Sequence, residues 1–239
     1  ILIHGLKKLE YRGYDSAGIA IINSETKNIT CNKTEGKLKN LINNINYKNI
    51  PGTVGIGHTR WATHGKPEVK NAHPHTDSSG TVAVVQNGII ENYQELKIKL
   101  EKEGITFNSD TDTEVIPHLI QRELNTLSKL KLENNGSTLL VAVRNVISDL
   151  EGSYALAVLW SGAPTSLVVA RRQAPLIIGL GEGEFICASD TPAIANFTNI
   201  ILPMEDEEIA LCTPLGIEIY DSNNERQYRN PISLKVSEQ

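Results

Sequence analysis

Hydrophobic positions in the first half of the chain follow helical and strand spacing in turn. Leu2, Leu6 and Leu9 recur at helical intervals, and Gly13 is a plausible end of that helix. Further apolar segments predict strands at residues 17–22, 29–34, 53–58 and 82–86, and a short helix at residues 38–45. Residues 60–80 predict a polar loop. A loop of about twenty residues is usually functional or disordered, and its residue types favour function.

The rest of the chain shows a block of helices followed by strands. Helices are predicted at residues 91–103 and 137–150 and after Asp112, with Pro117 in the first turn of the last of these. Short apolar segments between Gly, Pro and Asp turns predict strands at residues 154–160, 166–170, 176–179, 184–189, 200–203, 208–212 and 216–220, and a short helix at residues 192–197. Strands on both sides of a helical block predict α+β layers rather than a regular βαβ alternation.

Composition narrows the class of protein. The 239 residues are 40% hydrophobic, enough for a core, and the net charge of −5 argues against nucleic acid as a partner. No apolar run approaches the roughly 20 residues of a membrane span, and we expect neither a signal peptide nor a membrane contact. Cys31, Cys187 and Cys212 are widely spaced, which favours reduced thiols in a cytoplasmic protein. We expect one domain over residues 1–226, with a polar linker beginning at residues 227–239.

Several polar side chains at the ends of predicted elements suit a small zwitterion. A guanidinium binds a carboxylate through two parallel hydrogen bonds, and Arg60 lies just past a predicted strand. A carboxylate binds an ammonium group, and Asp112 lies at a predicted helix start. Each residue has a simpler alternative, because Arg60 could form a surface ion pair and Asp112 could cap its helix.

Other residues suit the chemistry of an amide. An oxyanion hole commonly combines a backbone N–H with a side-chain amide, and Asn87-Gly88 at the predicted strand end offers both. Trp61 could cover a substrate, and Thr63 and His64 could orient it. The alternative for Asn-Gly is a hairpin turn. Four histidines lie nearby, but their spacing matches no standard ligand motif, so we expect no metal and assign them to ordering the loop. They are His58, His64, His73 and His75.

Five segments of the chain form a specific set of motifs. They are Glu10-Tyr-Arg-Gly-Tyr-Asp-Ser-Ala-Gly18, His58-Thr-Arg-Trp-Ala-Thr-His-Gly65, Asn71-Ala-His-Pro-His75, Asn87-Gly-Ile-Ile-Glu-Asn92 and Thr111-Asp-Thr-Glu114. In this order they resemble the glutaminase domains of class II glutamine amidotransferases, in the form of the glucosamine-6-phosphate synthase family (glutamine–fructose-6-phosphate aminotransferases, isomerizing). The resemblance extends over about residues 1 to 225. The first segment favours this form over the amidophosphoribosyltransferases, which typically have His-Arg-Gly-Gln there.

The resemblance implies a fold and a glutamine site. The fold is α+β, a four-layer αββα sandwich of the N-terminal-nucleophile hydrolases with two antiparallel sheets. In the family, the residues that match Arg60 and Asp112 hold the carboxylate and the amine of L-glutamine, and those that match Asn87 and Gly88 form the oxyanion hole. Arg12 helps to order the surroundings of the nucleophile.

The same resemblance assigns Trp61, Thr63 and His64 to a loop that closes over glutamine. The family hydrolyses glutamine to glutamate without a cofactor or metal. It passes the ammonia to fructose 6-phosphate on a C-terminal sugar isomerase domain, which gives glucosamine 6-phosphate. We expect a homodimer for the full-length enzyme.

Two departures from the family pattern matter. The family nucleophile is an N-terminal cysteine, whereas this chain begins at Ile1, so we expect the nucleophile to be absent from it. Gln86 stands where many relatives have a histidine, and an amide cannot titrate. Two alternatives therefore stay open at this point. One is a catalytically silent module that binds glutamine, and the other is the glutaminase domain of another class II amidotransferase.

Overall fold

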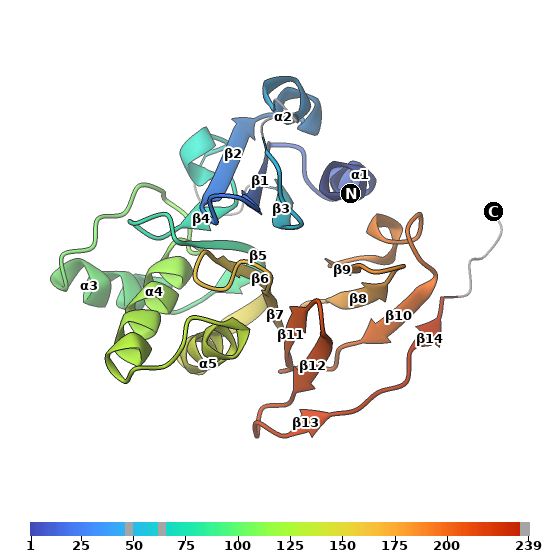
Figure 1. Cartoon of the computed structure of the whole chain (residues 1–239). Helices are drawn as coiled ribbons and strands as arrows, with labels where there is room; N and C mark the ends of the chain where they lie inside the picture. The colour runs from blue at the N-terminus through green and yellow to red at the C-terminus, as the bar shows by residue number, and fades with distance from the viewer. Residues whose placement is uncertain (46–49, 62–65, 235–239) are drawn as a thin grey trace.

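A seven-stranded antiparallel sheet forms the centre of the molecule (Figure 1). The structure is a computed structural model that describes residues 1–45, 50–61 and 66–234. The central sheet contains, in spatial order, β13 (Arg226–Gln227), β12 (Gly216–Tyr220), β11 (Ile209–Thr213), β7 (Leu167–Arg172), β6 (Gly152–Trp160), β5 (Val82–Ile90) and β4 (His75–Thr76). Its longest pairing joins β5 to β6, from Val82 opposite Trp160 to Ile90 opposite Gly152.

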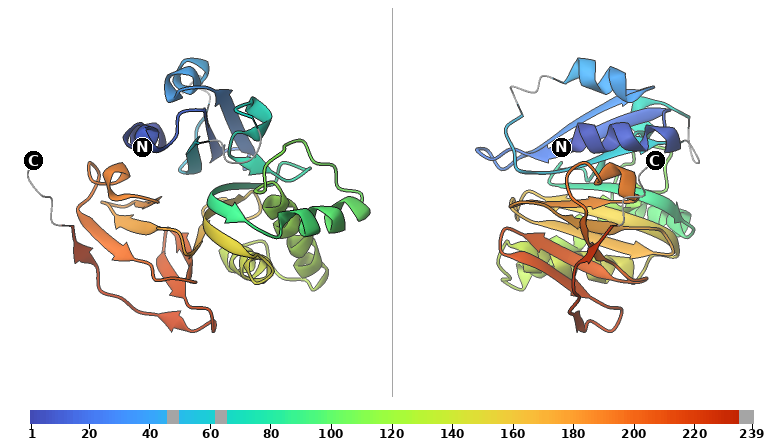
Figure 2. Two further views of the ribbon diagram at one scale, coloured as in Figure 1. Left: turned by 180° about the vertical axis from the view of Figure 1, so that it is seen from behind. Right: turned by 90° about the vertical axis from the view of Figure 1, so that its right-hand side faces the viewer.

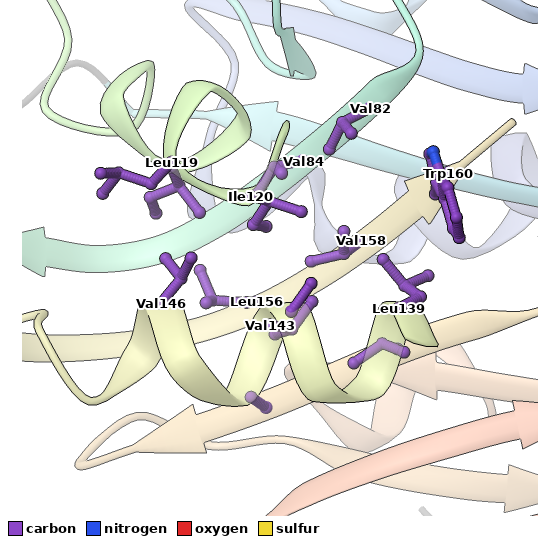
Figure 3. Close-up of a cluster of buried hydrophobic side chains, with 14 of the residues drawn as sticks. Val82, Val84, Leu119, Ile120, Leu139, Val143, Val146, Leu156, Val158 and Trp160 are labelled. Atoms are coloured by element: carbon purple, nitrogen blue, oxygen red, sulfur yellow. The ribbon is translucent and has the colours of Figure 1, made fainter. Parts of the chain in front are cut away.

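Three helices cover one face of the central sheet. They are α3 (Tyr93–Lys102), α4 (Val115–Lys129) and α5 (Gly136–Ile147). Because strand side chains alternate between faces, Val82 and Val84 of β5 point toward these helices and pack with Leu139 and Val143 of α5 in one buried cluster (Figure 3). Helix α5 starts where the side chain of Asn135 accepts a hydrogen bond from the backbone of Thr138.

Two smaller antiparallel sheets lie over the other face of the central sheet. One has the order β2 (Ile29–Glu35), β1 (Ser16–Ile22), β3 (Val54–Arg60), and the other β14 (Ile232–Ser233), β10 (Ile200–Pro203), β8 (Ile177–Leu180), β9 (Phe185–Ala188). Ala20 and Ile22 of β1 pack toward the central sheet with Ala83 and Val85 of β5. The four-stranded sheet packs against the same face through a separate cluster.

The outer layer on this side consists of α1 (Leu2–Leu9) and α2 (Leu38–Asn44). Leu6 and Leu41 pack there against Ile19, on the outward face of β1. Helix α1 also lies beside the short 3-10 turn η4 (Thr191–Ala193), as Figure 2 shows. The prediction of a four-layer αββα fold is therefore confirmed. Strand pairing in the described residues divides the second sheet layer into two sheets.

Three features differ from the predicted pattern. The polar loop contains the 3-10 turn η3 (Val69–Asn71) and β4, and much of it is buried. Strand β5 continues through Asn87 and Gly88 to Ile90, so these two residues lie within a strand and neither end it nor form a hairpin turn. Residues 192–197 contain no α-helix, because only the short turn η4 forms there.

The C-terminal residues take part in pairing. In β14, Ile232 lies opposite Ile201 of β10. Strand β14 thus falls within the expected linker at 227–239 and is paired in the four-stranded sheet. The domain boundary itself stays a prediction. No helix among the described residues is long and apolar enough to cross a membrane.

Leu139→Ala tests the core between α5 and the central sheet. Leu139 is fully buried, and removing its side chain leaves a cavity, so we expect the free energy of unfolding to fall by about 2–5 kcal/mol. Urea unfolding measures the change. Leu130→Ala is the matched control, because Leu130 is 69% exposed and its loss is expected to cost less than about 0.5 kcal/mol. Equal losses in the two variants would contradict this account of the core.

Candidate active site

A cavity of about 1030 Å³ is lined by residues of all three sheets and of α1. Its apolar wall includes Ile19 of β1 and Leu167 of β7. The polar part is lined by residues from the end of β3, from β5 and from the segment before α4. Among the predicted site residues it contains Arg12, Arg60, Trp61, Asn87, Gly88 and Asp112. Six of the eight predicted residues thus line one cavity, while Thr63 and His64 lie outside the described residues.

Arg60 is the last residue of β3, and only 4% of its surface is exposed. Its Nη1 donates a hydrogen bond to the carbonyl oxygen of Lys66, at 3.3 Å. Burial lowers the pKa of Arg60, and the carboxylates of Asp15 and Asp112 raise it in opposition. The guanidinium therefore lies in an interior position near negative charge, which excludes the simple alternative of a surface ion pair.

Asp112 is a buried acid in the cavity wall, with 5% of its surface exposed. One carboxylate oxygen, Oδ2, accepts a hydrogen bond from the backbone N–H of Ile90, at 2.7 Å. The N-cap of α4 is Glu114, so Asp112 does not cap this helix. Its bond to Ile90 instead ties the segment before α4 to the end of β5.

Two further side chains hold that segment. Glu114 accepts hydrogen bonds from the backbone of Asn108 and Ser109, at 2.9 and 2.7 Å. Burial raises the pKa of this carboxyl, but the imidazole of His118, at 3.8 Å, and the hydrogen bonds from residues 108 and 109 outweigh that effect and lower the pKa to about 2. Asn71 lies fully buried between the two loops. It accepts from the backbone of Asp110 and donates to the carbonyl of Lys66. Arg60 and Asn71 thus share one carbonyl acceptor.

Asn87 and Gly88 follow each other in β5 at the cavity wall. The Oδ1 of Asn87 lies 2.8 Å from Nε2 of His58. Gly88 has φ +126°, and a Cβ atom there would lie 2.1 Å from the carbonyl oxygen of Ser153 on the paired strand. Glycine is therefore required by the backbone, and the absent side chain keeps the strand accessible from the cavity.

Three histidines form a group behind Asn87, in which His73 and His75 are buried and His58 is half-buried. The rings of His58 and His73 stack at 4.2 Å, and those of His73 and His75 meet edge to face at 4.8 Å. Burial lowers the pKa of His58 to about 4 and that of His75 to about 3, and it holds the pKa of His73 well below its usual value. The rings are therefore neutral near pH 7. The described residues contain no group of side chains arranged to hold a metal ion.

Arg12 and Trp61 lie at the rim of the cavity. Nη1 of Arg12 is 3.5 Å from the carboxylate of Asp190, to which the hydroxyl of Tyr11 also donates at 2.6 Å. The indole of Trp61 is 59% exposed and lies 5.6 Å from the ring of Tyr14. These contacts join the 3-10 turn that follows α1 (Glu10–Arg12) to the N-cap of η4 and leave Trp61 accessible at the mouth of the cavity.

The buried histidines predict that folding stability depends on pH. Unfolded imidazoles take up protons near pH 6.5, whereas the folded rings of His58 and His75 resist protonation until about pH 4 and 3. The contribution of these rings to the free energy of unfolding is therefore expected to be fully present above pH 6.5. It falls as the pH drops toward 4, by up to about 1.4 kcal/mol per pH unit for each ring. Urea unfolding at pH 7.5, 6.0 and 5.0 measures this slope. His58→Gln is expected to flatten it, and a midpoint independent of pH would contradict the prediction.

Sequence reasoning missed two members of the site. The contact of His58 with Asn87 could have been inferred from alternation, since Ile56, His58 and Arg60 share the face of β3 that packs toward β5. No pattern in the sequence signals that Asn71 connects the two loops, because its partners are backbone groups far along the chain.

Comparison with known proteins gives the class of protein. The model of the glutamine amidotransferase domain family matches residues 58–196. Two solved structures have this fold: the glutamine phosphoribosylpyrophosphate amidotransferase of B. subtilis (29% identity, TM-score 0.75, over 95% of this chain and 46% of that one) and the allosteric regulatory enzyme of purine biosynthesis (28%, TM-score 0.76, 96% and 46%). The fold and the matched segment define an amidotransferase domain of the N-terminal-nucleophile hydrolase class.

The chain belongs to the glutamine amidotransferase family. The glutamine–fructose-6-phosphate aminotransferase (isomerizing) of Thermosynechococcus vestitus is 54% identical over 98% of this chain and 36% of its own length. The corresponding enzyme of Nostoc sp. is 53% identical over 99% of this chain and 37% of its own length. The chain thus spans about a third of these relatives. Matches to enzymes over almost all of this chain do not favour a silent glutamine-binding module.

Proposed function

We propose that this chain is the glutaminase part of a glutamine–fructose-6-phosphate aminotransferase, and that it hydrolyses L-glutamine to glutamate and ammonia. The observation that carries the proposal is the polar part of the cavity. A buried cation, a buried carboxylate and a side-chain amide next to a glycine line it together. A free amino acid that carries a carboxamide is complementary to this set of groups.

Each group has a role in the proposed reaction. Arg60 binds the α-carboxylate of glutamine, and Asp112 binds its α-ammonium group, which together fix the position of the side-chain amide. Attack on that amide places negative charge on its oxygen. Nδ2 of Asn87 and the backbone N–H of Gly88 donate to this oxygen and stabilise the transition state. Trp61, with Thr63 and His64, covers the bound substrate, and Arg12 orders the surroundings of the nucleophile.

The nucleophile of the proposed reaction is an N-terminal cysteine in a segment preceding Ile1, as the family resemblance implies. Two thiols of this chain do line the cavity, those of Cys187 and Cys212. Interaction with Cys212, together with burial, holds the pKa of Cys187 well above its usual value. This is opposite to the lowered pKa that activates a cysteine, so Cys187 is not assigned the role. Cys212 is not assigned it either, because this residue lies within β11 and has no free α-amine.

The remaining steps belong to the whole protein. The relatives named as isomerizing aminotransferases are about three times as long as this chain. We assign the transfer of ammonia to fructose 6-phosphate to a C-terminal sugar isomerase domain, and the full-length protein to a homodimer. The proposed location is cytoplasmic.

Two measurements on the full-length protein test the proposal. Glutamate release from L-glutamine is expected, together with formation of glucosamine 6-phosphate when fructose 6-phosphate is present. A diazoketone analogue of glutamine is expected to add once per chain, on the N-terminal cysteine, and peptide mass spectrometry identifies the labelled residue. Labelling of Cys187 or Cys212 instead would overturn the assignment of the nucleophile, and absence of glutamate release would overturn the proposed reaction.

A further inference from the structure

Asn87 meets His58 across the gap between two sheets. Along β3 the side chains of Ile56, His58 and Arg60 point toward the central sheet, and along β5 those of Val85 and Asn87 point back. The apolar members of these rows form a buried cluster, and the next pair along is His58 and Asn87, joined at 2.8 Å. Both side chains also line the cavity. This polar pair therefore lies at the boundary between the apolar core of the two sheets and the cavity.

The contact fixes the tautomer of His58. An amide oxygen only accepts hydrogen bonds, so the bond to Oδ1 of Asn87 requires a proton on Nε2 of the ring. If the amide were turned over, its Nδ2 would donate to Nε2 and the ring proton would move to Nδ1. That atom is buried and makes no hydrogen bond of normal geometry among the described residues, although the backbone of Gln86 interacts with the ring. A buried N–H without an acceptor is rare and costly, so the observed orientation is favoured.

The ring of His58 is held from behind. His73 stacks on it with an interplanar angle of 16°. His73 is held in turn by the backbone N–H of Gln86, which donates to its Nδ1 at 3.3 Å. His75 continues the group and lies 3.0 Å from the hydroxyl of Thr111, the residue before Asp112. A continuous series of contacts therefore links Asn87 to the segment that carries Asp112. Burial also lowers the pKa of His58 to about 4, so the donor is a neutral ring.

We propose that His58 is a positioning residue of the site: its Nε2–H holds Oδ1 of Asn87 and so turns the Nδ2 donor of the same amide toward the cavity. The inference rests on the proposed function, because Nδ2 matters only if it stabilises an oxyanion. An amide in the opposite orientation would present an oxygen lone pair to the developing negative charge and would raise the barrier. His58 thus acts through Asn87 and does not touch the substrate amide itself.

The test compares variants of the full-length protein by kcat and KM for glutamate release. His58→Leu removes the donor, whereas His58→Gln places an amide N–H close to the position of Nε2. We expect His58→Leu to lower kcat about 10- to 100-fold, a part of the loss that follows removal of an oxyanion donor. KM for glutamine is expected to stay within about threefold, since ground-state binding does not involve this bond. His58→Gln is expected to recover most of kcat.

A double-mutant cycle with Asn87→Ala separates positioning from general damage to the fold. If His58 acts through Asn87, adding His58→Leu to Asn87→Ala lowers kcat no further, and the two effects are strongly non-additive. Additive losses would overturn the inference, as would an equal loss of kcat in His58→Leu and His58→Gln. If His58→Leu does not fold, His58→Asn replaces it, because its amide is too short to reach Asn87 and the same losses are expected.

The outcomes for this inference and for the proposed function are distinct. The positioning role would be overturned if the wild-type protein is active, the Asn87→Ala variant is severely impaired and the His58→Leu variant is fully active. The proposed function would then still stand. A wild-type protein that releases no glutamate would overturn the function, and the role of His58 with it.

Discussion

Asn87→Ala in the full-length protein is expected to lower kcat for glutamate release about 100- to 1,000-fold, the usual loss when one oxyanion-hole donor is removed. KM for glutamine is expected to change little, because negative charge on the amide oxygen develops only in the transition state. The structural reason is the location of Asn87 in the cavity wall, with its oxygen bound to His58. Steady-state assays of glutamate release give both constants.

Asn92→Ala is the matched control for this prediction. Asn92 follows the same strand, and its amide donates to the carbonyl of Asp149 and accepts from the backbone of Glu151, at 2.8 and 3.0 Å. It does not line the cavity. We expect this variant to lose about 1–2 kcal/mol of stability with kcat unchanged within about twofold. A comparable fall of kcat in both variants would contradict the role of Asn87.

Arg60→Ala is expected to lower kcat/KM for glutamine roughly 30- to 700-fold, mainly through KM. This corresponds to the ~2–4 kcal/mol lost when one partner of a buried charge pair is removed. The guanidinium is only 4% exposed, so water cannot readily replace it as a partner of the substrate carboxylate. Arg60→Lys keeps the charge but loses the two-pronged geometry, and an intermediate value is expected.

A substrate analogue without the α-carboxylate tests the same contact between Arg60 and the substrate. The analogue 4-aminobutanamide lacks the α-carboxylate of glutamine and keeps the amide and the amine. The wild-type protein is expected to discriminate strongly against it, whereas Arg60→Ala is expected to turn over the two substrates with similar kcat/KM. Undiminished preference for glutamine in Arg60→Ala, as measured by competition, would show that another group holds the carboxylate. The unfolding midpoint of each variant reports whether loss of the buried cation also weakens the fold.

Strands and helices could be predicted because local patterns determine them. The bounds of β10 and β12 agree with the apolar segments at 200–203 and 216–220, and Pro117 lies in the first turn of α4 as expected. The four-layer arrangement followed from the resemblance and is supported by the burial of alternate side chains of β1 on opposite sides. Where apolar residues recur with a clear helical or strand period, burial of the apolar face determines which element forms.

The polar site was only partly predictable, because long-range hydrogen bonds override the local pattern. Asn87-Gly88 has the sequence of a hairpin turn, but pairing with β6 carries the strand through it. Part of the expected polar loop, residues 71–75, is interior. Buried side chains satisfy the backbone of this region, as Asp77 does by accepting from the N–H groups of Ser79, Thr81 and Val82. The bond between Asp112 and Ile90 likewise joins residues that no spacing rule connects.

Gly88 shows how the cavity limits sequence variation. Exposed positions usually accept many residues, yet this exposed position accepts none but glycine, since any side chain would collide with the carbonyl of Ser153 and would require a strained backbone. An alignment of relatives in which this column never varies would therefore be explained by strand packing alone. The invariance of Gly88 would not identify a catalytic residue, whereas variation at Asn87, which no such collision restricts, would report directly on the chemistry.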